Sequence, residues 1–299
     1  IPSKALLESS ELYHRANDEF RAHGISFDAA RFDLAAMQKR KAGIVRQSTA
    51  GILTLFKGAG VTPLTGHGRL LAGRKVEFTG HDGSKRMLQA KHVVLASGSE
   101  PMPLRGAAFD GDRIVNSWGA LDFTVVPKRL CVIGAGVIGL ELGSVWRRLG
   151  AETVMLEALP QFLPMADAQL AKEAARHFKK LGLEIRLGAK VTGAAVQKDG
   201  VQVSYSDAQG AQSLVVDRLI VAIGRVPNTD GLGCEAVGLI VSRGAAARDD
   251  DTRRGLPRLQ HTAAGAAHPS RARDIRRPPP PAGGAPPPAS SRRRRSRAP

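Results

Sequence analysis

The sequence has 299 residues, which is enough for two domains of ordinary size, and a hydrophobic fraction of 42% that suits a globular protein. Its two cysteines, Cys131 and Cys234, are far apart and lack CxxC-type spacing, which argues against a disulfide framework or a zinc site. The sequence contains no run of about 18 apolar residues, so no membrane span is predicted. The formal net charge of +17 would suit a nucleic-acid partner, but residues 243–299 hold 14 Arg and 4 Asp, so +10 of that charge belongs to one biased tail.

The amino-terminal part of the sequence predicts two helices, three strands and a linker. Apolar residues spaced by three and four positions predict helices over residues 4–20 and 30–56, although Gly43 and Gly51 are unfavourable inside the second. Glycine-rich turns separate expected strands at residues 61–62, 75–79 and 88–95. The last strand runs into the turn Ser97-Gly98-Ser99, and residues 101–127 are predicted to form a linker.

Residues 130–157 have the order of a dinucleotide-binding unit, namely strand, glycine turn, helix, strand and acid. The turn is Gly134-Ala135-Gly136-Val137-Ile138-Gly139. In this pattern the first glycine makes a tight turn, the second lets the backbone approach a pyrophosphate, and the third lets helix and strand pack closely. The helix N-terminus then offers N–H groups and a positive dipole end to the phosphates.

Glu157 follows the second strand, at about the spacing where an acid binds a ribose 2′-hydroxyl. Because Arg or Lys would suit a 2′-phosphate there, the sequence favours NAD over NADP. A glycine turn that serves packing alone is the competing interpretation, and the two strands and the acid argue against it.

The rest of the chain predicts further α/β structure and then a tail. We expect a helix after Asp167 that ends at Gly182, and strands at residues 183–187, 201–205 and 214–223. After Gly244 the periodicity stops, and 10 of the 18 prolines lie there. Such a segment cannot bury enough apolar surface to offset its ordering entropy, so disorder is predicted.

Six segments carry a family pattern along the chain. They are Ile1-Pro2-Ser3-Lys4-Ala5-Leu6-Leu7, Leu55-Phe56-Lys57-Gly58, Gly66-His67-Gly68, Ala96-Ser97-Gly98-Ser99-Glu100-Pro101, residues 134–143, and Ala222-Ile223-Gly224-Arg225-Val226-Pro227-Asn228-Thr229. In this order they resemble the flavin-dependent pyridine nucleotide–disulfide oxidoreductases, and among these the dihydrolipoamide dehydrogenases. The resemblance covers residues 1 to about 243.

The resemblance implies an α/β fold with three parts. A partial FAD-binding Rossmann-like domain is expected at residues 1–124, a complete NAD-binding Rossmann-like domain at 125–243, and a disordered Arg/Pro/Ala-rich tail at 244–299. The implied reaction oxidises the dihydrolipoyl groups of 2-oxo acid dehydrogenase complexes, with electrons passing through a disulfide and FAD to NAD. A homodimer, association with subunits of such a complex, and a bacterial cytoplasmic or mitochondrial matrix location are implied as well.

The same resemblance carries site residues onto this chain. Lys4 and Glu141 match a supporting pair at the flavin and nicotinamide, and no metal is expected. The FAD contacts match Lys4, Gly68, Ser97, Gly98 and Ser99. The NAD contacts match Gly134, Ala135, Gly136, Val137, Ile138, Gly139, Leu140, Glu141, Glu157, Val191 and Gly224. Without the resemblance, Lys4 would be a solvated lysine, Glu141 a residue favourable to the helix dipole, and Ser97-Gly98-Ser99 an ordinary turn.

Departures from the family pattern concern the reacting groups. The redox cysteine pair, the first FAD glycine turn and the His-Glu base have no counterpart in this sequence. We therefore expect a chain truncated at both ends that does not turn over by itself. His268-Pro269-Ser270 resembles the base motif only by chance, and a shifted reading frame is our hypothesis for the Arg/Pro/Ala-rich tail.

Two other functions compete with this interpretation. A non-catalytic NAD-binding module could bind nucleic acid through the five arginines within residues 292–297, but no aromatic residue lies there to stack on bases, so we expect no nucleic-acid partner. A sister disulfide reductase for glutathione or mercuric ion is the other alternative. Glu157 and Leu140-Glu141-Leu142-Gly143 argue against those NADPH-dependent enzymes.

Overall fold

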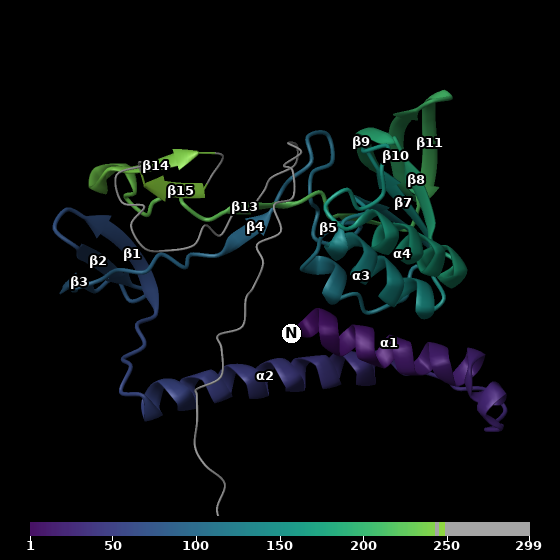
Figure 1. Cartoon of the computed structure of the whole chain (residues 1–299), viewed down its shortest axis with the longest axis horizontal. Helices are drawn as coiled ribbons and strands as arrows, with labels where there is room; N and C mark the ends of the chain where they lie inside the picture. The colour runs from purple at the N-terminus through teal and green to yellow at the C-terminus, as the bar shows by residue number, and fades with distance from the viewer. Residues whose placement is uncertain (243–244, 249–299) are drawn as a thin grey trace, which may run out of the picture. The chain divides into compact units, whose positions relative to one another are not determined.

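A five-stranded parallel sheet organises the computed structural model, which describes residues 1–242 and 245–248 (Figure 1). The strands lie in the order β5-β12-β6-β7-β8, and every neighbouring pair is parallel. Their bounds are Ile114–Asn116 for β5, Arg218–Val221 for β12, Arg129–Ile133 for β6, Glu152–Glu157 for β7 and Glu184–Leu187 for β8. The predicted α/β class with a Rossmann-like sheet is confirmed, and β6 pairs in parallel with β7, as a dinucleotide-binding unit requires.

Alternate residues of this sheet enter two separate hydrophobic cores. Leu130 and Val132 of β6 belong to one core, whereas Cys131 and Ile133 belong to the other. Successive side chains of a strand point to opposite faces, so a run that is apolar throughout requires cover on both. Two helices provide it on one side, α3 (Val137–Arg148) and α4 (Ala168–Leu181). An antiparallel meander provides it on the other, β9 (Lys190–Gln197), β10 (Gly200–Asp207) and β11 (Gly210–Val216).

Helix α4 begins and ends where the sequence signals predict. The Asp167 carboxylate caps α4 by accepting hydrogen bonds from the backbone N–H groups of Gln169 and Leu170, at 2.9 and 3.3 Å. Gly182 ends the same helix with φ of +89°, a conformation that favours glycine. The predicted helix between Asp167 and Gly182 is therefore confirmed.

The first 58 residues form two helices, α1 (Pro2–Asp18) and α2 (Leu34–Gly58), with a 3₁₀ turn at Phe20–His23 between them. Leu6 of α1 is 1% exposed and joins the core on the α3 side of the parallel sheet. Glu11 of α1 forms an ion pair with Arg148 of α3. Packing against α3 therefore anchors α1 to the dinucleotide-type unit.

Three smaller sheets complete the described structure. An antiparallel meander contains β1 (Gly66–Leu71), β2 (Lys75–Gly80) and β3 (Lys85–Gln89). A two-stranded ribbon pairs β4 (Ser99–Pro101) with β13 (Arg225–Pro227), and another pairs β14 (Leu239–Ser242) with β15 (Ala245–Arg248). Short 3₁₀ turns lie at Gly119–Leu121 and Glu235–Val237.

Several strand expectations are wrong. Residues 61–62 form no strand, and the strand expected at 88–95 is replaced by β3, which ends at Gln89. Val94 in the unpaired stretch is 85% exposed. An apolar run becomes a buried strand only when neighbouring strands accept its backbone hydrogen bonds, and the described residues provide none here.

Two more expectations fail because tertiary pairing overrides local pattern. The single strand expected at 214–223 divides into β11 and β12, which belong to different sheets. The expected linker at 101–127 contributes β5 to the edge of the parallel sheet.

The predicted tail is described only at its start. Residues 245–248 form β15, although disorder was expected from residue 244. The rest of the predicted tail, including His268, Pro269, Ser270 and the five arginines, lies outside the described residues.

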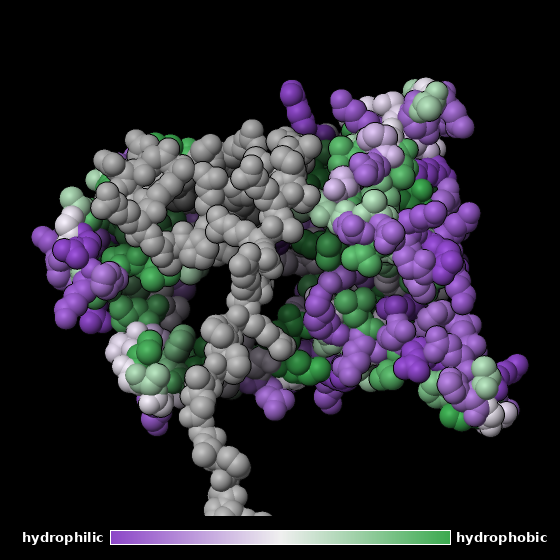
Figure 2. All heavy atoms as spheres, viewed as in Figure 1, coloured by the Kyte–Doolittle hydropathy of each residue, from purple (hydrophilic) through white to green (hydrophobic). Residues whose placement is uncertain are grey.

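The second half of α2 exposes a group of apolar side chains, which contributes to the green area at the lower left of Figure 2. Ile52, Leu53, Leu55 and Phe56 are all exposed there. The helix continues through Gly43 and Gly51, although glycine is unfavourable inside a helix. Within the described residues, no helix has both the length and the apolar character needed to cross a bilayer.

We predict that Trp146→Ala lowers the free energy of unfolding by about 3–5 kcal/mol, because this indole is fully buried beside Phe123 with ring centroids 5.1 Å apart. Denaturant unfolding followed by far-ultraviolet circular dichroism measures the change. Leu170→Ala is the control, because this exposed side chain of α4 should cost less than about 0.5 kcal/mol. Equal effects of the two substitutions would contradict the assigned core.

Candidate dinucleotide-binding site

The glycine turn connects β6 to α3 at the carboxyl end of the parallel sheet, where open α/β sheets bind ligands. Gly134 has φ of +98°, and its N–H donates to the Leu156 carbonyl of β7 at 2.8 Å. A Cβ at Gly139 would lie 2.0 Å from the Gly134 carbonyl oxygen, so only glycine permits this approach of helix to turn. The roles predicted for Gly134 and Gly139 match this geometry.

Gly136 and the start of α3 leave open space for a ligand. A Cβ added at Gly136 would meet no atom within 4 Å, and Val137 beside it is exposed. Gly136 is the N-cap of α3 and provides no side chain, so the first turn presents its backbone N–H groups outward. Leu140 is buried in the core, which leaves only its main chain toward this side.

Glu157, the last residue of β7, lies against the glycine turn. One carboxylate oxygen accepts a hydrogen bond from the Ala135 N–H at 2.8 Å, and the other accepts from the Leu159 N–H at 2.9 Å. An ionised carboxylate has about four acceptor positions, so it can also receive a ribose hydroxyl. The acid and the turn, which the sequence predicted as parts of one dinucleotide-binding unit, are thus in direct contact.

Lys4 and Glu141 form an ion pair between α1 and α3. The Lys4 Nζ donates to the Glu141 carboxylate, and the two side chains are 66% and 27% exposed. Glu141 lies in the second turn of α3, four residues after Val137. The resemblance matched these residues to a supporting pair, and the structure brings their charged ends into contact although they are 137 positions apart in the chain.

The turn Ser97-Gly98-Ser99 is joined to the segment that follows β12. Gly98 has φ of +74°, and its carbonyl accepts from the Asn228 N–H at 3.0 Å. The Gly224 carbonyl accepts from the Met102 N–H at 3.0 Å. Expected flavin contacts and one expected NAD contact, Gly224, therefore lie on one hydrogen-bonded ribbon.

Gly68 and Val191, two further expected cofactor contacts, lie on strands outside the glycine turn and the turn at Ser97. Gly68 lies on β1, and no hydrogen bond or ion pair within the described part of the chain joins it to the turn at Ser97. Val191 lies at the start of β9, close to the acid, because the nearby Ala189 N–H donates to the Glu157 carbonyl at 2.9 Å. Sequence reasoning assigned no role to Arg225 or Asn228, although both stand in a segment that carried the family pattern.

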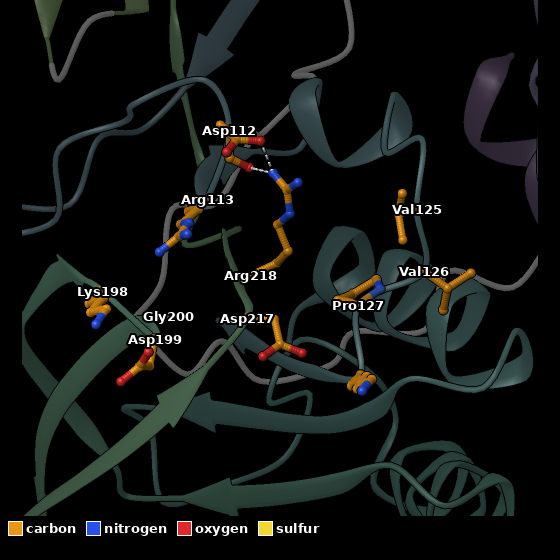
Figure 3. Close-up of a pocket in the computed structure, with 11 residues that line it drawn as sticks. Asp112, Arg113, Val125, Val126, Pro127, Lys198, Asp199, Gly200, Asp217 and Arg218 are labelled. Atoms are coloured by element: carbon orange, nitrogen blue, oxygen red, sulfur yellow. Dashed lines mark hydrogen bonds and ion pairs between the residues drawn. The ribbon is translucent and has the colours of Figure 1, made fainter.

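A cavity of about 550 Å³ opens at the opposite, amino-terminal ends of β6 and β12 (Figure 3). Two of its carboxylates have cationic partners, since Asp112 pairs with Arg218, and Asp217 pairs with Arg129 at 3.2 Å. Ligands in open parallel sheets bind outside the carboxyl ends of the strands, so this cavity is separate from the candidate site. Among the described residues no group of three or more His, Cys, Asp or Glu could hold a metal ion.

Both cysteines are free and buried. Burial raises the pKa of the Cys131 thiol to about 12, so it is protonated near neutral pH. Cys234 is the N-cap of the 3₁₀ turn at Glu235–Val237, away from the strand that holds Cys131. Because both thiols are buried, neither cysteine has the access to substrate that a reactive thiolate needs.

A family model described as pyridine nucleotide-disulphide oxidoreductase matches residues 1–259. The chain belongs to this family. It is 48% identical over 261 residues to a dihydrolipoyl dehydrogenase of Cupriavidus necator, a match that covers 87% of this chain and 55% of the relative. It is also 48% identical over 242 residues to dihydrolipoyl dehydrogenase 3 of Pseudomonas putida, covering 80% of this chain and 52% of the relative.

A solved structure agrees with this family membership. The crystal structure of LpdA from Mycobacterium tuberculosis superposes with a TM-score of 0.73 at 28% identity, covering 82% of this chain and 53% of that one. The chain spans about half the length of the curated relatives it matches.

Family membership implies FAD and NAD(H) as cofactors. The residues at the glycine turn fit a dinucleotide, because Gly136 leaves open space, α3 directs its N-terminus there, and Glu157 stands beside it. Toward FAD the described residues offer Lys4 and the open turn at Gly98, where an added Cβ would meet no atom within 4 Å. The sequence holds one glycine fingerprint, so an equivalent pyrophosphate cradle for FAD is not among these residues.

We predict that Gly139→Ala lowers the affinity for NAD at least about tenfold and the free energy of unfolding by about 1–3 kcal/mol, because backbone must move to accept the methyl group. Isothermal titration and denaturant unfolding measure the two effects. Gly51→Ala is the matched control, since it is also a helical glycine but has no atom within 4 Å of the added Cβ. The control should be neutral or stabilise by about 0.5–1 kcal/mol, and identical behaviour of both variants would refute the close approach.

Proposed function

We propose that this chain binds NAD at the 134–139 turn as the electron acceptor of a dihydrolipoyl dehydrogenase-type reaction. The observation that carries the NAD assignment is the Glu157 carboxylate, held by the Ala135 N–H at the mouth of the turn. A carboxylate there attracts the 2′-hydroxyl of NAD and repels the 2′-phosphate of NADP. Gly224, which follows β12 next to β6 at the same edge of the sheet, would be a further contact of the bound dinucleotide.

The dihydrolipoyl substrate is proposed from the relatives. Two of them, each 48% identical to this chain, are named dihydrolipoyl dehydrogenases, and this supports the substrate class over a glutathione or mercuric-ion reductase. The homodimer, the 2-oxo acid dehydrogenase complex and the bacterial or mitochondrial location remain predictions from the same resemblance.

The chain's own residues would bind and orient rather than react. Bound FAD would supply the two-electron chemistry between the sulfur substrate and the nicotinamide. Lys4 would place a positive charge next to the bound flavin, and Glu141 would orient the Lys4 ammonium through their ion pair. Ser97, Gly98 and Ser99 would present a turn to the flavin, while α3 would hold the pyrophosphate of NAD by its N-terminus.

Disulfide exchange needs an attacking thiolate and a second sulfur that completes the exchange. The two cysteines of this chain do not provide that couple, because both are buried and the Cys131 thiol has a raised pKa. The reaction also needs a base that takes the proton of the dithiol. We therefore propose that this chain does not oxidise dihydrolipoamide by itself.

The NAD assignment predicts that Glu157→Ala lowers NAD affinity about tenfold, because a charge-assisted hydrogen bond to ribose is lost. NADP should bind the original chain at least about tenfold more weakly than NAD. Titration calorimetry with both dinucleotides measures these values. Glu152→Ala removes a carboxylate from the opposite end of β7 and should leave NAD affinity unchanged. Equal affinity of the original chain for NAD and NADP would overturn the assignment.

The second expectation is that the purified chain, with saturating FAD and NAD, shows no turnover of dihydrolipoamide. The assay follows NADH absorbance, and the dihydrolipoyl dehydrogenase of Cupriavidus necator serves as the active control. Turnover on the order of 1 per second or more, the range of ordinary enzymes, would show that the two buried cysteines suffice. NADH-dependent reduction of an artificial acceptor does not test this point, because such a route needs no disulfide.

A further inference from the structure

Consecutive hydrogen bonds tie the turn before β4 to the segment after β12. The paired strands place Arg225 opposite Pro101, Val226 opposite Glu100 and Pro227 opposite Ser99. Beyond the paired residues, the Asn228 amide side chain donates to the Ser97 carbonyl at 3.2 Å. The ribbon therefore holds the whole turn at Ser97-Gly98-Ser99, rather than only the strand that follows it.

Arg225, the first residue of β13, reaches the turn with its side chain. Its Nε donates to the Ser99 hydroxyl at 2.8 Å, and a terminal nitrogen of the same guanidinium donates to the Ser99 carbonyl. The guanidinium carbon lies 5.5 Å from the centre of the Trp118 ring, within the range of a cation–π contact. A planar guanidinium can make two directed hydrogen bonds and stack at once, which lysine cannot do.

Trp118 is itself fixed to the parallel sheet. The backbone N–H groups of Trp118 and Gly119 donate to the side-chain oxygen of Asn116, at 2.9 and 3.1 Å. Asn116 is the last residue of β5 and lies opposite Val221 of β12. Arg225 thus bridges the turn at Ser99 to a residue anchored at the carboxyl edge of the sheet.

The same edge carries the glycine turn. The Ala222 N–H donates to the Ile133 carbonyl at 2.8 Å, and a Cβ at Gly134 would lie 2.5 Å from the Ala222 carbonyl oxygen. Gly134, the end of β12, the β13 strand and the turn at Ser97 are therefore in contiguous contact. A displacement of the turn at Ser97 would therefore be transmitted to the glycine turn at Gly134 through these few hydrogen bonds and contacts.

We propose that Arg225 is a positioning residue, which fixes the turn Ser97-Gly98-Ser99 on the carboxyl end of the parallel sheet through Ser99 and Trp118. The distance between the expected flavin contacts at residues 97–99 and the NAD-binding turn at 134–139 would thereby be held constant. The part of this inference that concerns cofactors rests on the proposed function.

Amide hydrogen exchange on the purified full chain tests the proposal without any turnover. Arg225→Ala should speed exchange of the Met102 and Asn228 amides about tenfold, because their acceptors lie on the ribbon that Arg225 holds. Arg225→Lys should restore only part of the protection, since it keeps the charge over Trp118 but loses the fork to Ser99. If both amides exchange in Arg225→Ala at the same rates as in the unsubstituted chain, the proposal is overturned.

Arg218→Ala is the matched control. Arg218 also donates to a main-chain carbonyl, that of Asp112, and stacks 5.3 Å from the ring centre of Phe123, but it lies outside the ribbon. Its substitution should leave the Met102 and Asn228 amides unchanged. Circular dichroism checks folding, and Ser99→Ala, which removes one acceptor of Arg225, gives the same test if Arg225→Ala does not fold.

Added NAD gives a second measurement that loss of stability alone would not produce. NAD should protect the amides of residues 134–139 in both proteins, but it should protect residues 97–102 only where Arg225 is present. Equal protection of 97–102 with and without Arg225 would overturn its coupling role. Absence of NAD protection at 134–139 in the original chain would instead contradict the proposed function, while the rates in free protein would still judge the role of Arg225.

Discussion

The close approach of α3 to the 134–139 turn is the constraint on which the candidate site depends. Gly139 faces the Gly134 carbonyl at a distance that excludes any Cβ, and Gly134 in turn approaches the Ala222 carbonyl. These two approaches bring β6, α3 and the end of β12 to one point. The N-terminus of α3 is consequently directed over the carboxyl end of the sheet, where its dipole can act on an anionic ligand.

The parallel sheet makes this arrangement rigid by burying both of its faces. Side chains of β5, β12, β6 and β7 alternate between a helix-covered core and a core covered by the β9–β11 meander. A shift of register by one residue would exchange these two sets, so the register is strongly specified. Glu157 ends β7 within this register, and its position beside Ala135 follows from strand pairing rather than from flexible loop geometry.

Much of this half of the molecule could be predicted from sequence because its signals are local. The glycines, the apolar runs on either side and the acid lie within 28 consecutive residues, at 130–157, and Asp167 and Gly182 mark the ends of α4. The failures occur where pairing with distant segments decides. Residues 92–95 have a strand-like composition but pair with no strand in the described structure, and residues 114–116 lie in a proline-bounded stretch yet pair with β12. Arg225 was missed for the same reason, since its partners Ser99 and Trp118 are more than 100 residues away.

The Lys4–Glu141 pair shows which interactions determine the relation between α1 and α3. Lys4 is two-thirds exposed, and an ion pair in such a position contributes about 0–1 kcal/mol, less at higher salt. Leu6, two residues later, is buried in the core beside α3, and burial of a leucine contributes about 1.5–3 kcal/mol. Apolar packing therefore positions α1, and the charged pair results from that packing. A pair that adds little stability can still serve a function, because its geometry is maintained by neighbours that do not themselves need to meet a cofactor.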